Sequence, residues 1–472
     1  MRPVFDFLRY DDLPFMTRPN FVVELRHFAL WSVVVGAIEG NIAAVVASNT
    51  FGASKLLTTI VWAVPLLANI LNIVWGAVLR GRRRVPMVIL LAGCALVCIC
   101  SVALIPNAWH PWGGWCFAAQ LALTHVFMSG LITLRTSIWA VNYPRSHRAR
   151  IAGRLQSLRF GIAVAAASLL GLLFDWDASY YRYAYPTLAA IGALALLPLR
   201  RLRVRGERRE LRRFREHIQD EAASTNSDPS QGLRHGLRES LAILRRDRRF
   251  AGYLVAQSFL GSANFMVDPV LVSILTKQLF RDQYFLPGVL MLIIPVTMVL
   301  ITIRYWAAYF DRVGVLRFRI LNGSVWTASY VAVTAAILVL ELGGPGLTGV
   351  AIGILVFARI LNGIGRGGGA VAWPLGHLHF AGEHQAELYM GIHVALTGLR
   401  GLVMPLTGWA LHEWLGWGSF FVAVLAALVA NVLFVRLYRH DRRAASNRRP
   451  KPRRSARPRP APIRRRSAAF ES

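Results

Sequence analysis

The feature that most constrains this chain is a series of about twelve long apolar runs, separated by short polar stretches. Each run has about 20 residues with few charges, which is the length that an α-helix needs to cross a bilayer. Backbone amides inside a bilayer must be paired within their own segment, so these runs are predicted to be helices rather than strands. An apolar content of 55% supports this and excludes an ordinary water-exposed globule. We therefore predict an all-α polytopic membrane protein.

Two stretches of the chain follow the same pattern. The stretch from Trp306 to Gly323 reads WAAYFDRVGVLRFRILNG, and the stretch from Trp75 to Gly93 reads WGAVLRGRRRVPMVILLAG. Each one leaves an apolar run, crosses a short charged turn and enters the next apolar run. The sequence therefore predicts about twelve transmembrane helices, arranged as two six-helix pseudo-repeats.

These turns resemble the Gly-x-x-x-Asp-Arg-x-Gly turn of the major facilitator superfamily, which joins the second and third helices of each six-helix half. The later copy matches at Asp311, Arg312 and Gly314, whereas the earlier copy keeps Gly76 and has Arg80 in the place of the acid. The resemblance implies two bundles around a central cavity that rock between inward-open and outward-open states. It also implies a gating role for Gly76, Asp311, Arg312 and Gly314.

Basic residues divide the loops into two classes. They concentrate between alternate apolar runs, so the positive-inside rule places both termini and the central linker in the cytoplasm and the protein in the cell membrane. The predicted regions are a cytoplasmic segment at 1–26, a six-helix bundle at 27–199, a basic linker at 200–249, a second bundle at 250–437 and a disordered basic tail at 438–472.

The formal net charge of +30 raises the question of a nucleic-acid partner. The charge lies next to membrane segments, so we interpret the linker and the tail as contacts for anionic lipid headgroups and expect no nucleic acid. We expect a monomer without a cofactor. The four cysteines have no metal-ligand spacing, and the histidines near His377 and His379 do not match a zinc pattern, so no metal site is predicted.

Polar residues recur at the same spacing in the first predicted helix of each half. Glu39 lies near the middle of the earlier helix, and Asn264 and Asp268 lie on the corresponding face of the later one. Acids inside a membrane are costly and tend to be functional, so Glu39 and Asp268 are the candidates for proton coupling. The alternatives are a permanent ion pair between Glu39 and an arginine, and a place for Asp268 in an outer vestibule.

The candidate substrate-binding residues are polar side chains within the apolar runs. Arg359 and Arg400 fall near the bilayer midplane by helix rise, whereas snorkelling towards the cytoplasm explains Arg135 and Arg366. A run of glycines at 367–369 indicates either a broken helix beside the substrate or close helix packing. The complete set is Arg359, Asn362, Arg400, His393, Asn264, Gln257, Asn69 and Asn72.

These observations predict a secondary active transporter rather than an enzyme. It moves a small solute by alternating access, with proton coupling, and the intramembrane arginines favour an anionic solute. Two alternatives remain open at this level. One is a transporter-like membrane sensor that uses its basic linker and tail, and the other is a polytopic enzyme that handles lipids.

Overall fold

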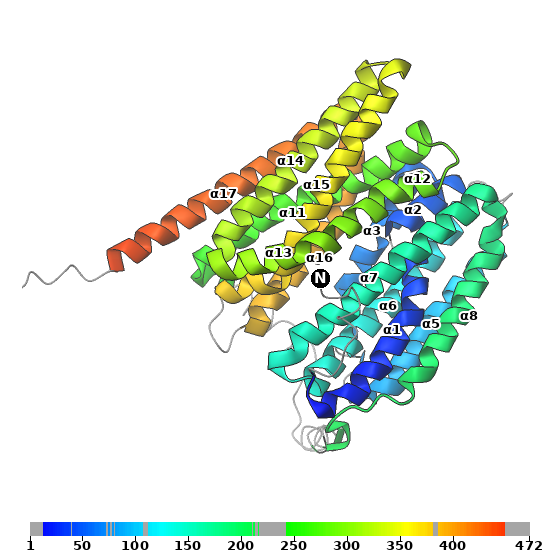
Figure 1. Ribbon diagram of the computed structural model, residues 1–472, viewed down its shortest axis with the longest axis vertical. Coiled ribbons are helices and arrows are strands. Elements are labelled where there is room, and N and C mark those ends of the chain that lie inside the picture. Colours follow the sequence, from blue (N-terminus) through cyan, green and yellow to red (C-terminus); the bar gives the residue numbers. More distant parts are fainter. Residues whose placement is uncertain are drawn as a thin grey trace, which may run out of the picture.

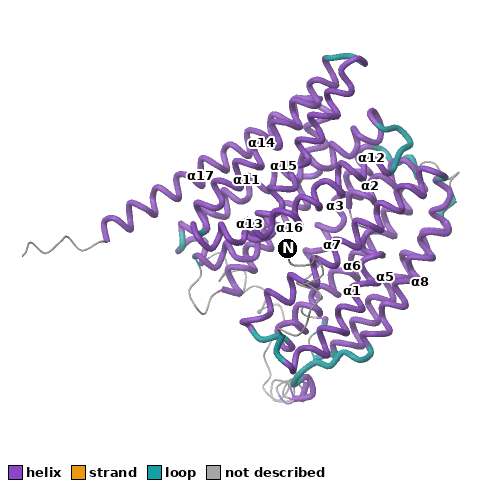
Figure 2. Tube along the Cα trace, viewed as in Figure 1, coloured by secondary structure: helices purple, strands orange, loops and turns teal. Residues whose placement is uncertain are grey.

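The computed structural model describes residues 13–38, 40–71, 74–75, 78–79, 81–106, 112–209, 211–212, 216, 242–380 and 386–448. This part of the chain consists of helices and short connections, and it contains no β-strand (Figure 2). The helices form two groups that follow each other in the sequence and lie side by side (Figure 1).

The first group corresponds to the first predicted bundle. The first predicted span is described as two consecutive helices, α1 and α2. They are counted separately because residue 39 between them lies outside the described residues. The helices are α1 (Arg18–Ile38), α2 (Gly40–Asn49), α3 (Lys55–Ala68) with the short η3 (Asn69–Leu71), α5 (Arg84–Ser101), α6 (Trp112–Asn142), α7 (Arg145–Trp176) and α8 (Tyr181–Leu199).

The second group repeats the number of spans. Its second span is interrupted by a π-helical turn, Val289–Ile293, between α12 and α13. The helices are α11 (Arg248–Ile274), α12 (Phe285–Gly288), α13 (Ile294–Val313), α14 (Val315–Leu342), α15 (Thr348–Leu375), α16 (Ala386–Leu415) and α17 (Ser419–Arg448).

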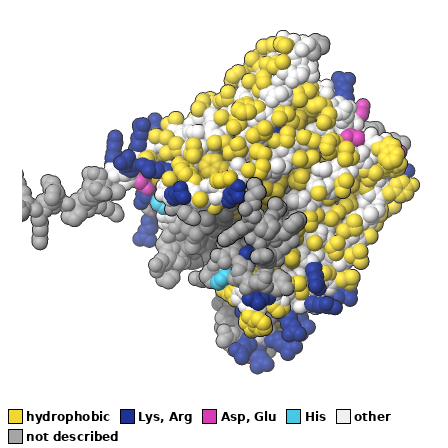
Figure 3. All heavy atoms as spheres, viewed as in Figure 1, with side chains coloured by type: hydrophobic (Ala, Val, Ile, Leu, Met, Phe, Trp, Pro, Cys, Tyr) yellow, Lys and Arg dark blue, Asp and Glu magenta, His cyan; other side chains and the backbone are white. Residues whose placement is uncertain are grey.

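Nine helical segments in the described residues are long and apolar enough to cross a membrane, and the last of these, Ile392–Arg443, contains both α16 and α17. Together with α3 and α8, these segments give twelve helices in two sets of six. The predicted fold class is therefore confirmed. Large apolar side chains such as Val97, Leu169 and Leu425 are exposed. Hydrophobic side chains cover much of the visible surface, as in a protein surrounded by lipid (Figure 3).

Two helices differ from the prediction in their course. The first span begins at Arg18 and not near His27, because Glu24 and His27 are buried and each is hydrogen-bonded to other helices, which compensates for their polarity. The glycine run at 367–369 does not break α15, which continues to Leu375. The alternative of close packing is correct, since a Cβ at Gly367 or Gly368 would meet side chains of the neighbouring helices α13 and α14.

Charged turns join the second and third helices of each half in different ways. In the second half, Gly314 alone separates α13 from α14, and its φ of 75° is a backbone conformation that favours glycine. In the first half, the left-handed residue is Gly81, with φ of 73°, and α5 begins only at Arg84. The two turns thus share a left-handed glycine, but at different places in the aligned motif.

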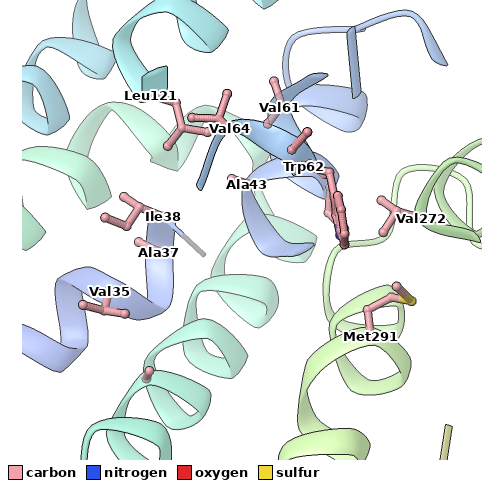
Figure 4. Packing of buried hydrophobic residues seen from close by; sticks show 14 of the residues in the cluster. Val35, Ala37, Ile38, Ala43, Val61, Trp62, Val64, Leu121, Val272 and Met291 are labelled. Carbon is pink, nitrogen blue, oxygen red and sulfur yellow. The ribbon is translucent and has the colours of Figure 1, made fainter. Parts of the chain in front are cut away.

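The two halves meet at one end of the molecule, which we call the closed end. Here the end of α2 and the residue after it contact the π-helical turn Leu275–Leu279 and the residue before α12, through the Ser48–Thr276 and Thr50–Tyr284 hydrogen bonds, each of 3.0 Å. All hydrogen bonds and ion pairs that join the halves among the described residues lie here or beside it. Apolar packing follows the same junction, where Trp62 of α3 lies near residues of the second half (Figure 4).

Candidate functional site

The polar face of α11 organises the candidate site. Gln257, Gly261, Asn264 and Asp268 follow each other at helical spacing along this face. The structure brings Asp268 together with α15 and brings Gln257 together with α16, so one face of α11 carries two separate buried polar clusters. Both contain arginines that were predicted to bind the substrate.

The first cluster, here called the Asp268 triad, consists of Asp268, Arg359 and Arg366. One carboxylate oxygen of Asp268 accepts a hydrogen bond from Arg359 Nη1 at 3.0 Å, and the other accepts one from Arg366 Nη2 at 2.5 Å. Arg359 also donates from Nε to the Leu290 carbonyl at 3.0 Å. Asp268 and Arg359 are 1% and 0% exposed. Asp268 is therefore enclosed and does not line an open vestibule in this structure, and Arg366 is directed at Asp268 rather than at the cytoplasmic surface.

Hydrogen-bonding capacity remains unused around the triad. Several buried polar atoms of α11, α14 and α15 have no partner among the described residues. These atoms are Arg359 Nη2, Arg366 Nε, Asn362 Oδ1, Asn264 Oδ1 and the Tyr330 hydroxyl. Unpaired buried polar atoms are uncommon in proteins, and they mark places where water, an ion or a ligand binds.

The second cluster surrounds Arg400 of α16, which is 8% exposed. Its guanidinium donates to the Gln257 carbonyl at 2.6 Å, to Thr397 Oγ1 at 2.9 Å and to the Leu396 carbonyl at 3.3 Å. Gly261 provides the space, because an added Cβ would collide with this guanidinium. No carboxylate among the described residues pairs with Arg400, which therefore remains a buried cation without an acid.

Further basic groups accompany Arg400. His393 is 2% exposed, lies against the Trp373 ring, and has no partner for Nε2 among the described residues. Arg319, also 2% exposed, donates to the Tyr253 hydroxyl and to the Ala372 carbonyl at 3.0 to 3.1 Å. The sequence analysis gave Arg319 no role, because it lies in the stretch from Trp306 to Gly323 that was read as a charged turn between two apolar runs.

The first half has its own buried polar cluster, which the sequence analysis missed. Glu24 of α1 is 3% exposed and accepts hydrogen bonds from Trp139 Nε1 and from the Tyr143 hydroxyl, the latter at 2.9 Å. Arg135 donates to His27 Nε2 at 2.8 Å and lies over an aromatic ring. His27 Nδ1 therefore carries the hydrogen that is donated to the Ala195 carbonyl. Arg135 thus points into the bundle and does not snorkel.

The remaining predicted residues are placed only in part. Glu39, Asn72 and Gly76 lie outside the described residues, and the side chains of Asn69 and Asp311 are not described. Arg312 is exposed in the last turn of α13, next to Gly314. Among the described residues, no group of three or more His, Cys, Asp or Glu side chains is arranged to hold a metal ion.

Two six-helix halves that enclose buried charges and contact each other at one end define a helical membrane protein of the transporter type. A comparison with family models identifies the Major Facilitator Superfamily over residues 28–355, and the chain belongs to this superfamily. No curated protein sequence matches it.

Solved structures of transporters have the same fold. The chain is similar to a peptide transporter POT in complex with sulfate, with 12% identity, coverage of 90% of this chain and 94% of that one, and a TM-score of 0.63. It is also similar to a D-xylose-proton symporter, with 13% identity, coverage of 89% of this chain and 97% of that one, and a TM-score of 0.61. A mutant of the nucleoside transporter NupG is similar as well, with 12% identity, coverage of 90% of this chain and 100% of that one, and a TM-score of 0.57. At these identities the likeness shows the fold, and the substrates belong to those proteins.

Proposed function

We propose that this protein is a secondary active transporter that moves a small anionic solute by alternating access and couples the movement to protons. The superfamily and the transporter fold support the general class. The contacts between the halves at the closed end fit one state of an alternating-access cycle. In this proposal the basic end of each half faces the cytoplasm, because Lys and Arg side chains gather there (Figure 3).

The observation that supports an anionic solute is the burial of Arg400 without a paired acid. A buried charge is stabilised by an opposite charge or by complete hydrogen bonding, and Arg400 finds only neutral oxygens in the described residues. A carboxylate or phosphate of the solute supplies the missing charge. His393 and Gln257 each have an unpartnered side-chain atom beside it, and we propose that these atoms contact the polar part of the solute.

Proton coupling is assigned to Asp268. It is buried in the membrane part of α11, and its charge controls two arginines, so its protonation changes the interactions of both. The D-xylose-proton symporter among the similar structures shows that this fold accommodates proton coupling. Glu39, the other predicted carrier, remains a candidate on sequence grounds.

A ligand screen tests the anionic solute. Thermal unfolding of the purified full chain is measured against a panel of carboxylates, phosphate esters and matched neutral compounds. We expect anions to stabilise the protein and Arg400→Gln to weaken the best ligand by 2 kcal/mol or more, about 30-fold. Arg400→Lys keeps the charge but loses the planar fork, so it should be intermediate.

Arg304→Gln is the matched control, because Arg304 is an exposed arginine of α13 whose hydrogen-bond and cation–π partner among the described residues is its neighbour Tyr305. It should leave the affinity unchanged. Retention of full affinity in Arg400→Gln, or an equal loss in Arg304→Gln, would refute the role of Arg400.

A further inference from the structure

The Asp268 triad has more positive charge and more donors than one carboxylate satisfies. Two guanidinium groups share Asp268, so the cluster carries a net charge of about +1 in its ionised form. Arg359 Nη2 and Arg366 Nε have no partner among the described residues. An uncompensated buried charge costs several kcal/mol, so a permanent structural pair would be expected to have balanced charges.

We propose that Arg359 and Arg366 bind the anionic group of the solute in place of the Asp268 carboxylate when Asp268 takes up a proton. The inference rests on the proposed function and specifies its coupling. The two arginines already approach separate oxygens of one planar carboxylate. A solute carboxylate, or another planar anion, therefore fits the same donors, and the two unpartnered nitrogens add further hydrogen bonds.

The local helix structure permits Asp268 to leave this position. Pro269 follows directly and has no amide hydrogen, so the α11 ladder lacks one hydrogen bond at this turn. The same helix continues as a π-helical turn at Leu275–Leu279. Arg366 is 30% exposed, whereas Arg359 and Asp268 are fully enclosed, so an incoming anion meets Arg366 first.

The Arg400 cluster lies along the same face of α11 as the Asp268 triad. Its guanidinium contacts α11 at Gly261, seven residues before Asp268, which corresponds to about 10 Å along the helix. Asn264 lies between them on the same face. Asn264 thus places a polar residue of α11 between the two clusters.

The charged groups around Asp268 make the proton the controlling event. Arg359 and Arg366 face it from α15, and Tyr330 of α14 lies within electrostatic range. Among the described residues, no ion pair reaches Asp268 from the other helices packed against α11, namely α2, α3, α16 and α17. One proton taken up by Asp268 thus accompanies one anion bound at the triad, and each ligand promotes binding of the other.

Nitrate is a suitable probe, because it is planar and stays ionised over the whole pH range. Its dissociation constant is measured by thermal unfolding of the full chain in detergent between pH 8 and pH 5, at constant ionic strength. For the natural sequence we expect nitrate to bind more tightly as the pH decreases, by up to about tenfold per pH unit if one proton is bound with each anion. Asp268→Asn should bind tightly at every pH.

Two double variants locate the bound nitrate. Asp268→Asn with Arg366→Gln should bind nitrate at least tenfold more weakly than Asp268→Asn alone. Asp268→Asn with Arg400→Gln should keep the tight, pH-independent binding of nitrate. Asp177→Asn is the control for a change in net charge, because Asp177 is exposed and its side chain caps Ser179 within its own segment. Equal nitrate affinity in the natural sequence and Asp268→Asn at pH 8 would overturn the inference.

The outcome at Arg400 separates this inference from the proposed function. If the nitrate effect depends on Arg400 and not on Arg366, the exchange at the triad is wrong, while anion binding at Arg400 stands. If neither arginine matters but a neutral solute binds, the proposed anionic solute fails as well.

Discussion

At the scale of single residues, the buried charges differ in how they are compensated. Asp268 is paired with two arginines, Glu24 accepts hydrogen bonds from two neutral donors with Arg135 within electrostatic range, and Arg400 has no acid among the described residues. The same residue type thus has different roles according to its partners. A paired acid responds to protonation by releasing its partners, whereas an acid held by neutral donors mainly fixes the helices that supply them.

The first residue-scale prediction concerns coupling. Asp268→Asn keeps the shape of the side chain but fixes its charge at zero, so transport no longer requires a proton at this position. In proteoliposomes, for a solute found in the screen, we expect solute exchange to continue and accumulation driven by a pH gradient to be lost. Accumulation at the normal level would show that Asp268 is structural, and Glu39→Gln would then be examined in the same assay.

The second residue-scale prediction concerns Glu24. A glutamine can accept from Trp139 Nε1 with its oxygen and donate to the Tyr143 hydroxyl with its nitrogen, so it preserves both contacts. Glu24→Gln should therefore destabilise the protein by less than about 1 kcal/mol, and Glu24→Leu, which removes the acceptor of both hydrogen bonds, by about 2 kcal/mol or more. Thermal unfolding of both variants checks this order, and equal stabilities would contradict it.

At the scale of helices, close approach at glycine positions determines where the side chains of the site lie. Gly261 admits the Arg400 guanidinium against α11. We predict that Gly261→Ala displaces Arg400 from the Gln257 carbonyl and weakens the best anion at least tenfold, about 1.4 kcal/mol or more. The ligand titration used for Arg400→Gln measures this. Gly161→Ala in α7, where an added Cβ meets nothing within 4 Å, should have no such effect.

The sequence was sufficient to predict the helices and their faces, because apolar length and polar spacing are local properties. The spacing of Gln257, Asn264 and Asp268 correctly predicted one face of α11. It could not predict that Arg359 and Arg366 pair with Asp268, since spacing within one helix does not identify the neighbouring helix. Similarly, Glu24 was assigned to the N-terminal segment because a hydropathy criterion gives a charged residue no credit for partners that are more than 100 positions away.

At the scale of the whole molecule, the contacts between the halves determine which state is populated. At the closed end, the Asp175 carboxylate of α7 accepts hydrogen bonds from the backbone amides of Tyr284 and Phe285, the latter at 3.1 Å. It therefore caps the start of α12 from the opposite half. Burial raises the pKa of the Tyr284 phenol to about 12, so this residue stays neutral and keeps its hydrogen bond to Thr50 near neutral pH.

The last prediction tests this cap as a determinant of the closed state. Opening of the closed end separates Asp175 from α12, and water then replaces the lost hydrogen bonds. Since the site is exposed, we expect the cap to stabilise the closed state by about 1.5 kcal/mol, so Asp175→Ala should increase the open fraction about tenfold.

The readout is the labelling rate of Ser48→Cys by a membrane-impermeant maleimide, in a background in which the four native cysteines are serine. Ser48 is 8% exposed in the closed state, so its labelling reports opening. Asp177→Ala is the matched control, because Asp177 lies two residues away and caps only its own segment through Ser179. An unchanged rate in Asp175→Ala, or an equal increase in Asp177→Ala, would show that the closed end is maintained by its other contacts, such as Thr50–Tyr284 and the apolar packing around Trp62.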